Sequence, residues 1–140
     1  MEITANALQT VTTGSNVVFT NTAVSGSQCI LHREGSGLVT LRGITNQCRA
    51  RFRITFGGNV ALPADTSPVT PISLAIALNG EPVAETTMIS TPATAAVYNS
   101  IGRVLFLDIP AGCCSQVSVE NTSASSISIQ NASLIIERVA

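Results

Sequence analysis

The sequence predicts an all-β fold, a jelly-roll β-sandwich of about eight to ten antiparallel strands. Segments with strand character follow one another at roughly even spacing, and turn clusters rich in Gly, Pro, Asn and Ser separate them. Helix signals are nearly absent, because the best candidate, residues 84–90 (AETTMIS), is short and β-branched. We therefore expect the 140 residues to form a single jelly-roll domain, 1–140, in which residues 1–15 could serve as an extended N-terminal arm.

The N-terminal half contains three strand signals. Residues 16–22 (NVVFTNT) are β-branched and aromatic, and residues 38–42 (LVTLR) lie between glycine-containing turns. Residues 48–56 (CRARFRITF) alternate between apolar side chains and arginine or threonine, so they predict a strand with one apolar and one cationic face. Residues 57–59 (GGN) form a cluster typical of a turn, which should end this strand.

A loop and a hairpin are predicted in the middle of the chain. Residues 62–71 (LPADTSPVTP) contain three prolines, which exclude a helix or a central strand and favour a surface loop. Residues 72–78 (ISLAIAL) then lead into Asn79-Gly80, the preferred pair for a type I′ hairpin turn. Pro82 in the returning arm predicts that this arm lies at a sheet edge or a bulge.

The last third of the chain contains four further strand signals. They are residues 94–98 (TAAVY), 103–109 (RVLFLDI), 114–123 (CSQVSVENTS) and 126–139 (SISIQNASLIIERV), with a turn at Pro110-Ala111-Gly112. In the last segment Leu134, Ile135 and Ile136 are consecutive, so both faces of the strand are apolar. Such a strand belongs at the centre of a sheet, with one face toward the core and the other toward a neighbouring subunit.

The composition points to an assembly. Only 11 % of the residues are charged, against about 25 % in typical domains, there is no lysine, and the net charge is −1. This balance gives no electrostatic basis for nucleic-acid binding, and the apolar runs are too short for membrane insertion. Because so few groups can solvate the exterior, we expect part of it to be covered by other copies of the chain in an obligate oligomer.

Three of the seven basic residues, Arg49, Arg51 and Arg53, lie on one face of the same predicted strand. They repel one another unless acceptors lie opposite. Three interpretations are open: a solvated outer face, a subunit interface, or a site for an anion or a sialic-acid-like ligand. We predict the subunit interface, with Leu134 and Ile136 contributing to it. The expected partners are carboxylates of a neighbouring subunit: Glu81, Glu85, Asp108 or Glu120.

The four cysteines and the single histidine are weak candidates for a metal site. Cys29 and His32 have a C-x2-H spacing, but Cys48 and the adjacent Cys113-Cys114 pair add no regular second half. We predict no metal and no cofactor. The thiols are expected to be buried and reduced, and Cys29 with Cys48 is the pair to test for a bridge. His32 is expected to be a polar residue beside the following Gly-Ser-Gly turn.

The sequence contains no recognisable catalytic arrangement. One histidine, eight scattered carboxylates and the absence of nucleophile or metalloprotease motifs leave no general base with an orienting partner, so we predict that the protein is not an enzyme. Glycan binding has limited support, because carbohydrate sites usually stack a sugar on an aromatic ring. Tyr98, with Asn99 beside it, is the aromatic residue best placed for this role.

Three segments resemble a known family. They are FRITFGGNV (52–60), ISLAIALNGEPV (72–83) and ASLIIERVA (132–140), in the same order and with the last at the chain terminus. The sequence resembles the C-terminal globular domain of the collagen-like glycoproteins of bacterial exosporium, a relative of the C1q and tumour-necrosis-factor jelly rolls. The resemblance implies a compact homotrimer used for binding or display. No Gly-X-Y tract precedes it here, which is a departure from the family.

Small trimeric domains of this kind also occur among phage virion proteins. The start of the sequence lacks the features of a secretory signal, so we expect synthesis in the host cytoplasm without a signal peptide. The leading expectation is a non-enzymatic, trimeric surface component of a phage virion, either a capsid decoration or a fibre head, in contact with other virion proteins. The alternatives are a carbohydrate- or receptor-binding head domain, and a head module on a bacterial spore or cell surface.

Overall fold

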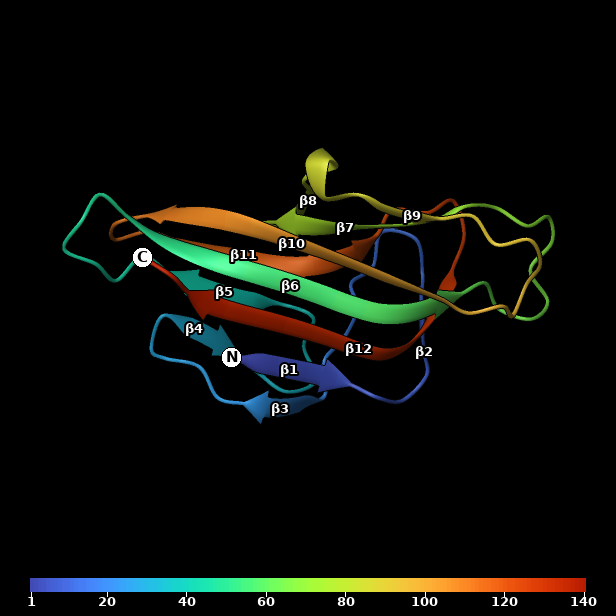
Figure 1. Cartoon of the computed structure of the whole chain (residues 1–140), viewed down its shortest axis with the longest axis horizontal. Helices are drawn as coiled ribbons and strands as arrows, with labels where there is room; N and C mark the ends of the chain where they lie inside the picture. The colour runs from blue at the N-terminus through green and yellow to red at the C-terminus, as the bar shows by residue number, and fades with distance from the viewer.

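The computed structural model describes all residues, 1–140, as two six-stranded sheets packed face to face (Figure 1). Every strand pair is antiparallel. Sheet A contains β1 (Glu2–Ala5), β2 (Gln9–Val11), β3 (Asn21–Val24), β6 (Arg49–Ala61), β10 (Asn99–Pro110) and β12 (Ile127–Arg138). Sheet B contains β4 (Ile30–His32), β5 (Val39–Arg42), β7 (Ile72–Leu78), β8 (Glu81–Pro82), β9 (Met88–Ser90) and β11 (Cys114–Asn121).

The predicted jelly-roll sandwich is confirmed. In sheet A the order is β10-β6-β12-β1-β3, and β2 also pairs with β12; in sheet B it is β4-β5-β11-β7-β8, and β9 also pairs with β7. The strand number is higher than expected because several short strands, such as β2, β8 and β9, extend the ladders. One short 3-10 turn, η1 (Ala84–Thr86), interrupts the β structure. No helix has the length and apolar character needed to cross a membrane.

The core lies between the two sheets and follows the period-2 pattern of the strands. It is a cluster of 27 buried residues, in which Phe52, Ile54 and Phe56 of β6 are at most 1 % exposed. Their neighbours Arg51, Arg53 and Thr55 must therefore point away from the core, because successive side chains of a strand alternate between faces. The apolar and cationic faces predicted for this strand are both present.

β6 continues through the glycines that were expected to end it. Gly57 and Gly58 pair with Gly102 and Ile101 of β10, and β12 pairs with β6 on the other side. Because β6 is hydrogen-bonded to a strand on each side, ladder pairing outweighs the local turn preference of a Gly-Gly-Asn sequence. A side chain at Gly58 would meet Ile129 Cδ1 at 3.2 Å, so the small residue also allows close packing there.

The first 15 residues are not an extended arm. β1 and β2 both pair with β12, and Ile3 and Val11 are buried in the core. The strand predicted at residues 94–98 is also wrong, since this segment is a turn in which Ala96 has a φ of 65° and its N–H donates to the Leu62 carbonyl at 2.9 Å. Residues 16–20 contribute only isolated bridges at Asn16 and Phe19, and the regular strand β3 begins later.

The hairpin predicted from Asn79-Gly80 is confirmed. Asn79 and Gly80 have φ values of 52° and 86°, as a type I′ turn requires, and they join β7 to β8. Pro82 lies in β8 at the edge of sheet B, where its missing N–H costs no ladder hydrogen bond. Residues 62–71 form a loop without strand structure, as their prolines predicted.

Candidate functional site

The outer face of sheet A carries the arginine row, and it is the candidate functional surface. Cross-strand partners in an antiparallel sheet point to the same face. Phe106 of β10 and Glu137 of β12 lie opposite Arg53 of β6, so these three residues form one row across the sheet. Asp108 of β10 lies opposite Arg51 in the next row. The register thus places acidic and apolar side chains beside the arginines.

Asp108 is the acceptor for two of the three arginines. Arg51 donates to it through both fork nitrogens, from Nε to Oδ1 at 2.8 Å and from Nη2 to Oδ2 at 3.1 Å. Arg49 Nε lies 3.1 Å from the same Oδ2. This bidentate geometry is the strongest arrangement for an arginine and a carboxylate, although all three side chains remain partly exposed to solvent.

The two charges alter each other's titration. The hydrogen bonds from Arg51 lower the pKa of Asp108 below its usual value. Desolvation opposes this effect, and the nearby positive charges of Arg51 and Arg49 add to it. Asp108 in turn raises the pKa of Arg51, first through the hydrogen bonds and then through its charge. Both groups therefore stay ionised over a wider pH range than they would alone.

Arg53 has a separate partner. Its Nε donates to Glu137 Oε1 at 2.7 Å, and its Nη2 contacts the same oxygen. The three arginines thus find carboxylates within their own chain. We predicted that the arginines reach carboxylates of a neighbouring subunit. Asp108 is one of the predicted acceptors, but it lies in the same chain and not in another one. Glu81 and Glu120 lie in sheet B and Glu85 in η1, and none of them pairs with the row.

Three large apolar side chains lie beside these ion pairs on the same face. Phe106, Val104 and Ile135 are 61 %, 52 % and 37 % exposed. Val104 of β10 and Ile135 of β12 both lie opposite Thr55 of β6, in the row next to Phe106 and Arg53. We call Val104, Phe106 and Ile135 the apolar band. Its residues lie on β10 and β12, on either side of β6, and they remain exposed in the single chain.

The band reaches an open sheet edge. β10 is the end strand of sheet A, and its 12 residues pair with β6 on one side. A long edge strand offers unpaired backbone groups to another chain, and native proteins usually shorten, charge or cover such edges. The open edge and the exposed Phe106 and Val104 lie together on this side of the domain, which makes it the candidate contact surface.

The prediction that Leu134 and Ile136 face a neighbouring subunit is wrong. They are 0 % and 1 % exposed and belong to the core, whereas Ile135 between them points outward. The cause is a bulge in β12, where the register with β6 shifts between Gln130 and Ser133 and Asn131 adopts a φ of 55°. Before the bulge, the side chains of Ile127 and Ile129 point into the core. The extra residue of the bulge shifts the alternation by one position, so the opposite set of side chains points inward after it.

Tyr98 and Asn99 lie where sequence reasoning placed them, next to a loop. Tyr98 is 42 % exposed, and Asn99 begins β10 at the end of the domain that is remote from the arginines. Neither residue lines a cavity. The hydrogen-bonded side chains near them are those of Ser100 and Asn59, which form a polar contact of 2.8 Å on the outer face of sheet A.

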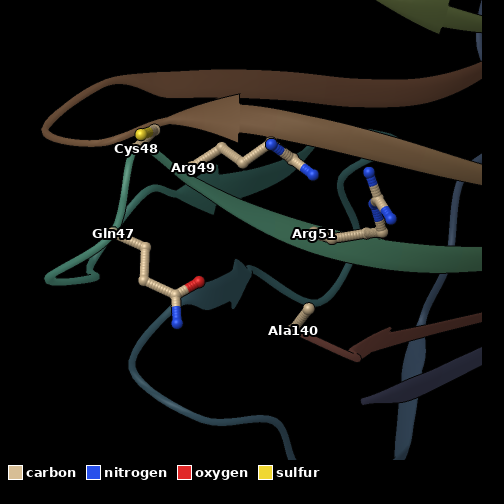
Figure 2. A pocket seen from close by; sticks show the side chains of 5 residues that line it. All are labelled: Gln47, Cys48, Arg49, Arg51 and Ala140. Atoms are coloured by element: carbon tan, nitrogen blue, oxygen red, sulfur yellow. The ribbon is translucent and has the colours of Figure 1, made fainter.

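The cavity beside the arginines is small. It measures about 130 Å³ and is lined by Gln47, Cys48, Arg49, Arg51 and Ala140 (Figure 2). The guanidinium groups of Arg49 and Arg51 point toward β10 rather than toward Ala140. Sites for small ligands usually enclose roughly 300–1,000 Å³. The cavity is therefore smaller than a typical small-molecule site, and both arginines that line it are already paired with Asp108.

The cysteines and His32 do not form a common site. Cys29 is buried and receives a hydrogen bond from Arg138 Nη1 at 3.3 Å, while Cys48, Cys113 and Cys114 are exposed. The expectation of buried thiols is thus wrong for three of the four, and Cys29 and Cys48 are not bridged. His32 Nε2 lies 2.9 Å from the Ser36 carbonyl, as expected for a polar residue beside the Gly-Ser-Gly turn.

One solved structure has an architecture similar to that of this chain. The globular domain of zebrafish complement 1qA protein superposes with a TM-score of 0.63 at 10 % identity, over 96 % of this chain and 93 % of that one. The chain has the C1q-like jelly-roll fold. A family 35 carbohydrate-binding module from Cellvibrio japonicus Abf62 matches all of this chain and 98 % of its own, with 11 % identity and a TM-score of 0.43. No protein-family model matches the sequence, and a search of curated proteins finds no relative.

The apolar band was not predicted from the sequence, although the sequence contains a signal for it. In RVLFLDI, Val104 and Phe106 share their parity with Asp108, and Leu105 and Leu107 have the opposite parity. The single acidic residue thus marks the outward face, and the two apolar residues on that parity are the ones that a partner would cover.

Proposed function

We propose that the chain is a non-enzymatic display domain that assembles as a homotrimer through the outer face of sheet A. The observation that supports this best is the apolar band, in which Phe106 is 61 % exposed in the single chain. A charge-poor protein gains stability by covering such a band, and native proteins usually cover or charge an open edge strand that carries exposed apolar side chains.

The position of the band favours a closed ring of subunits over a two-fold dimer. Val104 and Phe106 lie on the edge strand β10, whereas Ile135 lies two strands further into the sheet. The edge of one copy can therefore cover the face of the next copy, which is a head-to-tail contact. Head-to-tail contacts form a closed ring when the rotation between neighbouring copies is a whole fraction of a full turn. We propose a ring of three copies of this C1q-like jelly roll.

The ion pairs next to the band have a different role in this proposal. Arg53–Glu137 and the Arg49–Arg51–Asp108 group are already paired within one chain. These ion pairs keep the face polar beside the apolar band. When another copy covers the face, no unpaired charge is buried. Their contribution is to the alignment of the subunits more than to the affinity between them.

As the biological setting we propose the surface of a phage virion, where the trimer is a capsid decoration or a fibre head and contacts other virion proteins. The resemblance to trimeric display domains and the lysine-free, charge-poor exterior support this setting. The alternative is a head module on a bacterial spore or cell surface. The neighbouring genes separate the two: capsid and tail genes support the virion, and sporulation genes or collagen-like repeats contradict it.

A carbohydrate- or receptor-binding head is the second candidate, and the exposed Tyr98 favours it. A glycan array probed with the wild type and with Tyr98→Ala tests this role. Binding that is lost in the variant supports a sugar stacked on Tyr98, and no binding by either protein contradicts glycan recognition.

The solution mass tests the assembly itself. Light scattering at low micromolar concentration should give three times the 14.5 kDa of the chain. A folded species at the mass of one chain would contradict the proposal.

A further inference from the structure

Three exposed cysteines gather at one end of the sandwich. Cys48 lies at the end of the β5–β6 loop, directly before β6, and Cys113 and Cys114 lie at the turn from β10 into β11. Both connections are at the same end of the domain, together with the C-terminus (Figure 1). The fourth cysteine, Cys29, is buried and is not part of this group. We call Cys48, Cys113 and Cys114 the thiol end.

The two connections that carry these thiols are held together by backbone contacts. Ala111 N donates to the Cys48 carbonyl at 3.0 Å, Gly43 N donates to the Cys113 carbonyl at 2.8 Å, and Gly112 N donates to the Gly43 carbonyl at 3.0 Å. A side chain at position 43 would meet the Pro110 carbonyl oxygen at 2.2 Å, so only glycine permits this approach. The exposed thiols are therefore presented on a fixed support and not on independent loops.

The number of thiols leaves at least one of them without a partner in its own chain. Three exposed thiols can form at most one disulfide among themselves. Adjacent cysteines rarely bridge each other, because the disulfide geometry requires separated backbone positions, so a Cys113–Cys114 bond is disfavoured. Even if Cys48 were bridged to one of that pair, the other would stay free and exposed. Each chain thus keeps a thiol that can react only with another molecule.

We propose that the thiol end is a covalent cross-linking surface that joins one copy of the chain to another through disulfides. A second copy is the natural partner, because it presents the same thiols in the same arrangement. The thiol end lies in two connections and at the first residue of β11, at one end of the sandwich and apart from the apolar band on the strands of sheet A. Cross-linking can therefore add to the proposed trimer without competing for its contact surface, and it does not depend on the trimer.

The chemistry is thiol–disulfide exchange with a small disulfide as oxidant. A cysteine thiolate attacks one sulfur of the small disulfide, and a small thiolate leaves, so a mixed disulfide remains on the protein. A thiolate of a second copy then attacks the protein sulfur of that bond and releases the second small thiolate. Two protein thiols have lost two protons and two electrons, and one small disulfide has become two small thiols.

The number of exposed thiols in a chain limits how many neighbours it can be linked to, and this limit makes the proposal testable. The fully reduced protein is incubated with oxidised glutathione, quenched by alkylation and separated by non-reducing denaturing electrophoresis. The wild type should give covalent dimers, trimers and larger species that dithiothreitol collapses to one band. A chain that retains only Cys48 of the thiol end, through Cys113→Ser and Cys114→Ser, has a single exposed thiol beside the buried Cys29. It can be linked to one neighbour, so every band above the dimer should be lost. The triple variant with Cys48→Ser as well should stay monomeric.

Two controls separate a cross-linking surface from random collision of thiols. Cys29→Ala should retain the full ladder, because the buried thiol does not take part. Thr94→Cys in the triple-serine background moves one thiol to an exposed loop at the opposite end, and it should dimerise more slowly than the chain that retains only Cys48. Monomers that carry only glutathione or an internal bridge would overturn the proposal, as would equal rates for the two single-thiol chains.

Discussion

Replacing Phe106 by serine should dissociate the assembly without unfolding the subunit. An aromatic side chain covers roughly 150–250 Å² when buried, so the 61 % of Phe106 that is exposed in one chain leaves roughly 90–150 Å² for a partner to cover. At about 25 cal/mol per Å², covering it stabilises the assembly by about 2–4 kcal/mol for each chain. Three chains lose this contribution together. The trimer dissociation constant should therefore rise by at least about four orders of magnitude, since about 1.4 kcal/mol is a factor of ten.

The control for this variant is Ile89→Ser. Ile89 lies on β9 of sheet B and is 67 % exposed, so the substitution removes a similarly exposed apolar side chain from the other face of the domain. Sedimentation equilibrium at low micromolar concentration should find Phe106→Ser at the mass of one chain and Ile89→Ser at the mass of the wild type. If both variants keep the trimer mass, the apolar band is not the contact surface. If both variants lose it, dissociation does not depend on the outer face of sheet A.

Three further substitutions test the parts of the site separately. Leu134→Ala should lower the free energy of unfolding of the subunit by about 2–5 kcal/mol in chemical denaturation, because Leu134 is a core residue. A change in the mass of the assembly with unchanged subunit stability would show that Leu134 lies at a subunit interface. Arg51→Glu should shift the trimer dissociation constant far less than Phe106→Ser, because exposed ion pairs contribute about 0–1 kcal/mol, and complete dissociation would contradict this. Asp108→Asn should destabilise the fold at neutral pH. The pKa of Asp108 is lowered in the folded state, so its contribution is present above the ordinary aspartate pKa and is lost as the pH falls through the lowered one. Thermal unfolding midpoints of wild type and variant should therefore converge in acid, and a constant difference would refute the pairing.

The features that a few adjacent residues determine were predictable from the sequence. The Asn79-Gly80 turn requires positive φ at both positions, and few alternatives satisfy that requirement. The alternation from Arg49 to Phe56 determines which side chains enter the core once a sheet is assumed. These features depend on a few adjacent residues, and tertiary contacts did not override them.

The features that depend on long-range register were not predictable in the same way. The bulge at Asn131 exchanges the faces of β12, so the outward residue is Ile135 instead of Leu134 and Ile136. Gly57 and Gly58 remain in a strand because two neighbours pair with it. The partners of the arginines were also hidden, since Asp108 and Glu137 are 57 and 84 residues away from Arg51 and Arg53 and only the sheet order brings them together.

Hydroxyl-radical footprinting of the wild type tests the central claim most directly. The oxidation rates of Phe106 and Ile89, each normalised to its rate in the unfolded chain, are measured by mass spectrometry at low micromolar concentration. The two residues are similarly exposed in the single chain, at 61 % and 67 %. If the apolar band is covered by a neighbouring copy, Phe106 should be strongly protected relative to Ile89. Equal normalised rates would show that the outer face of sheet A is open to water and would contradict the proposed assembly.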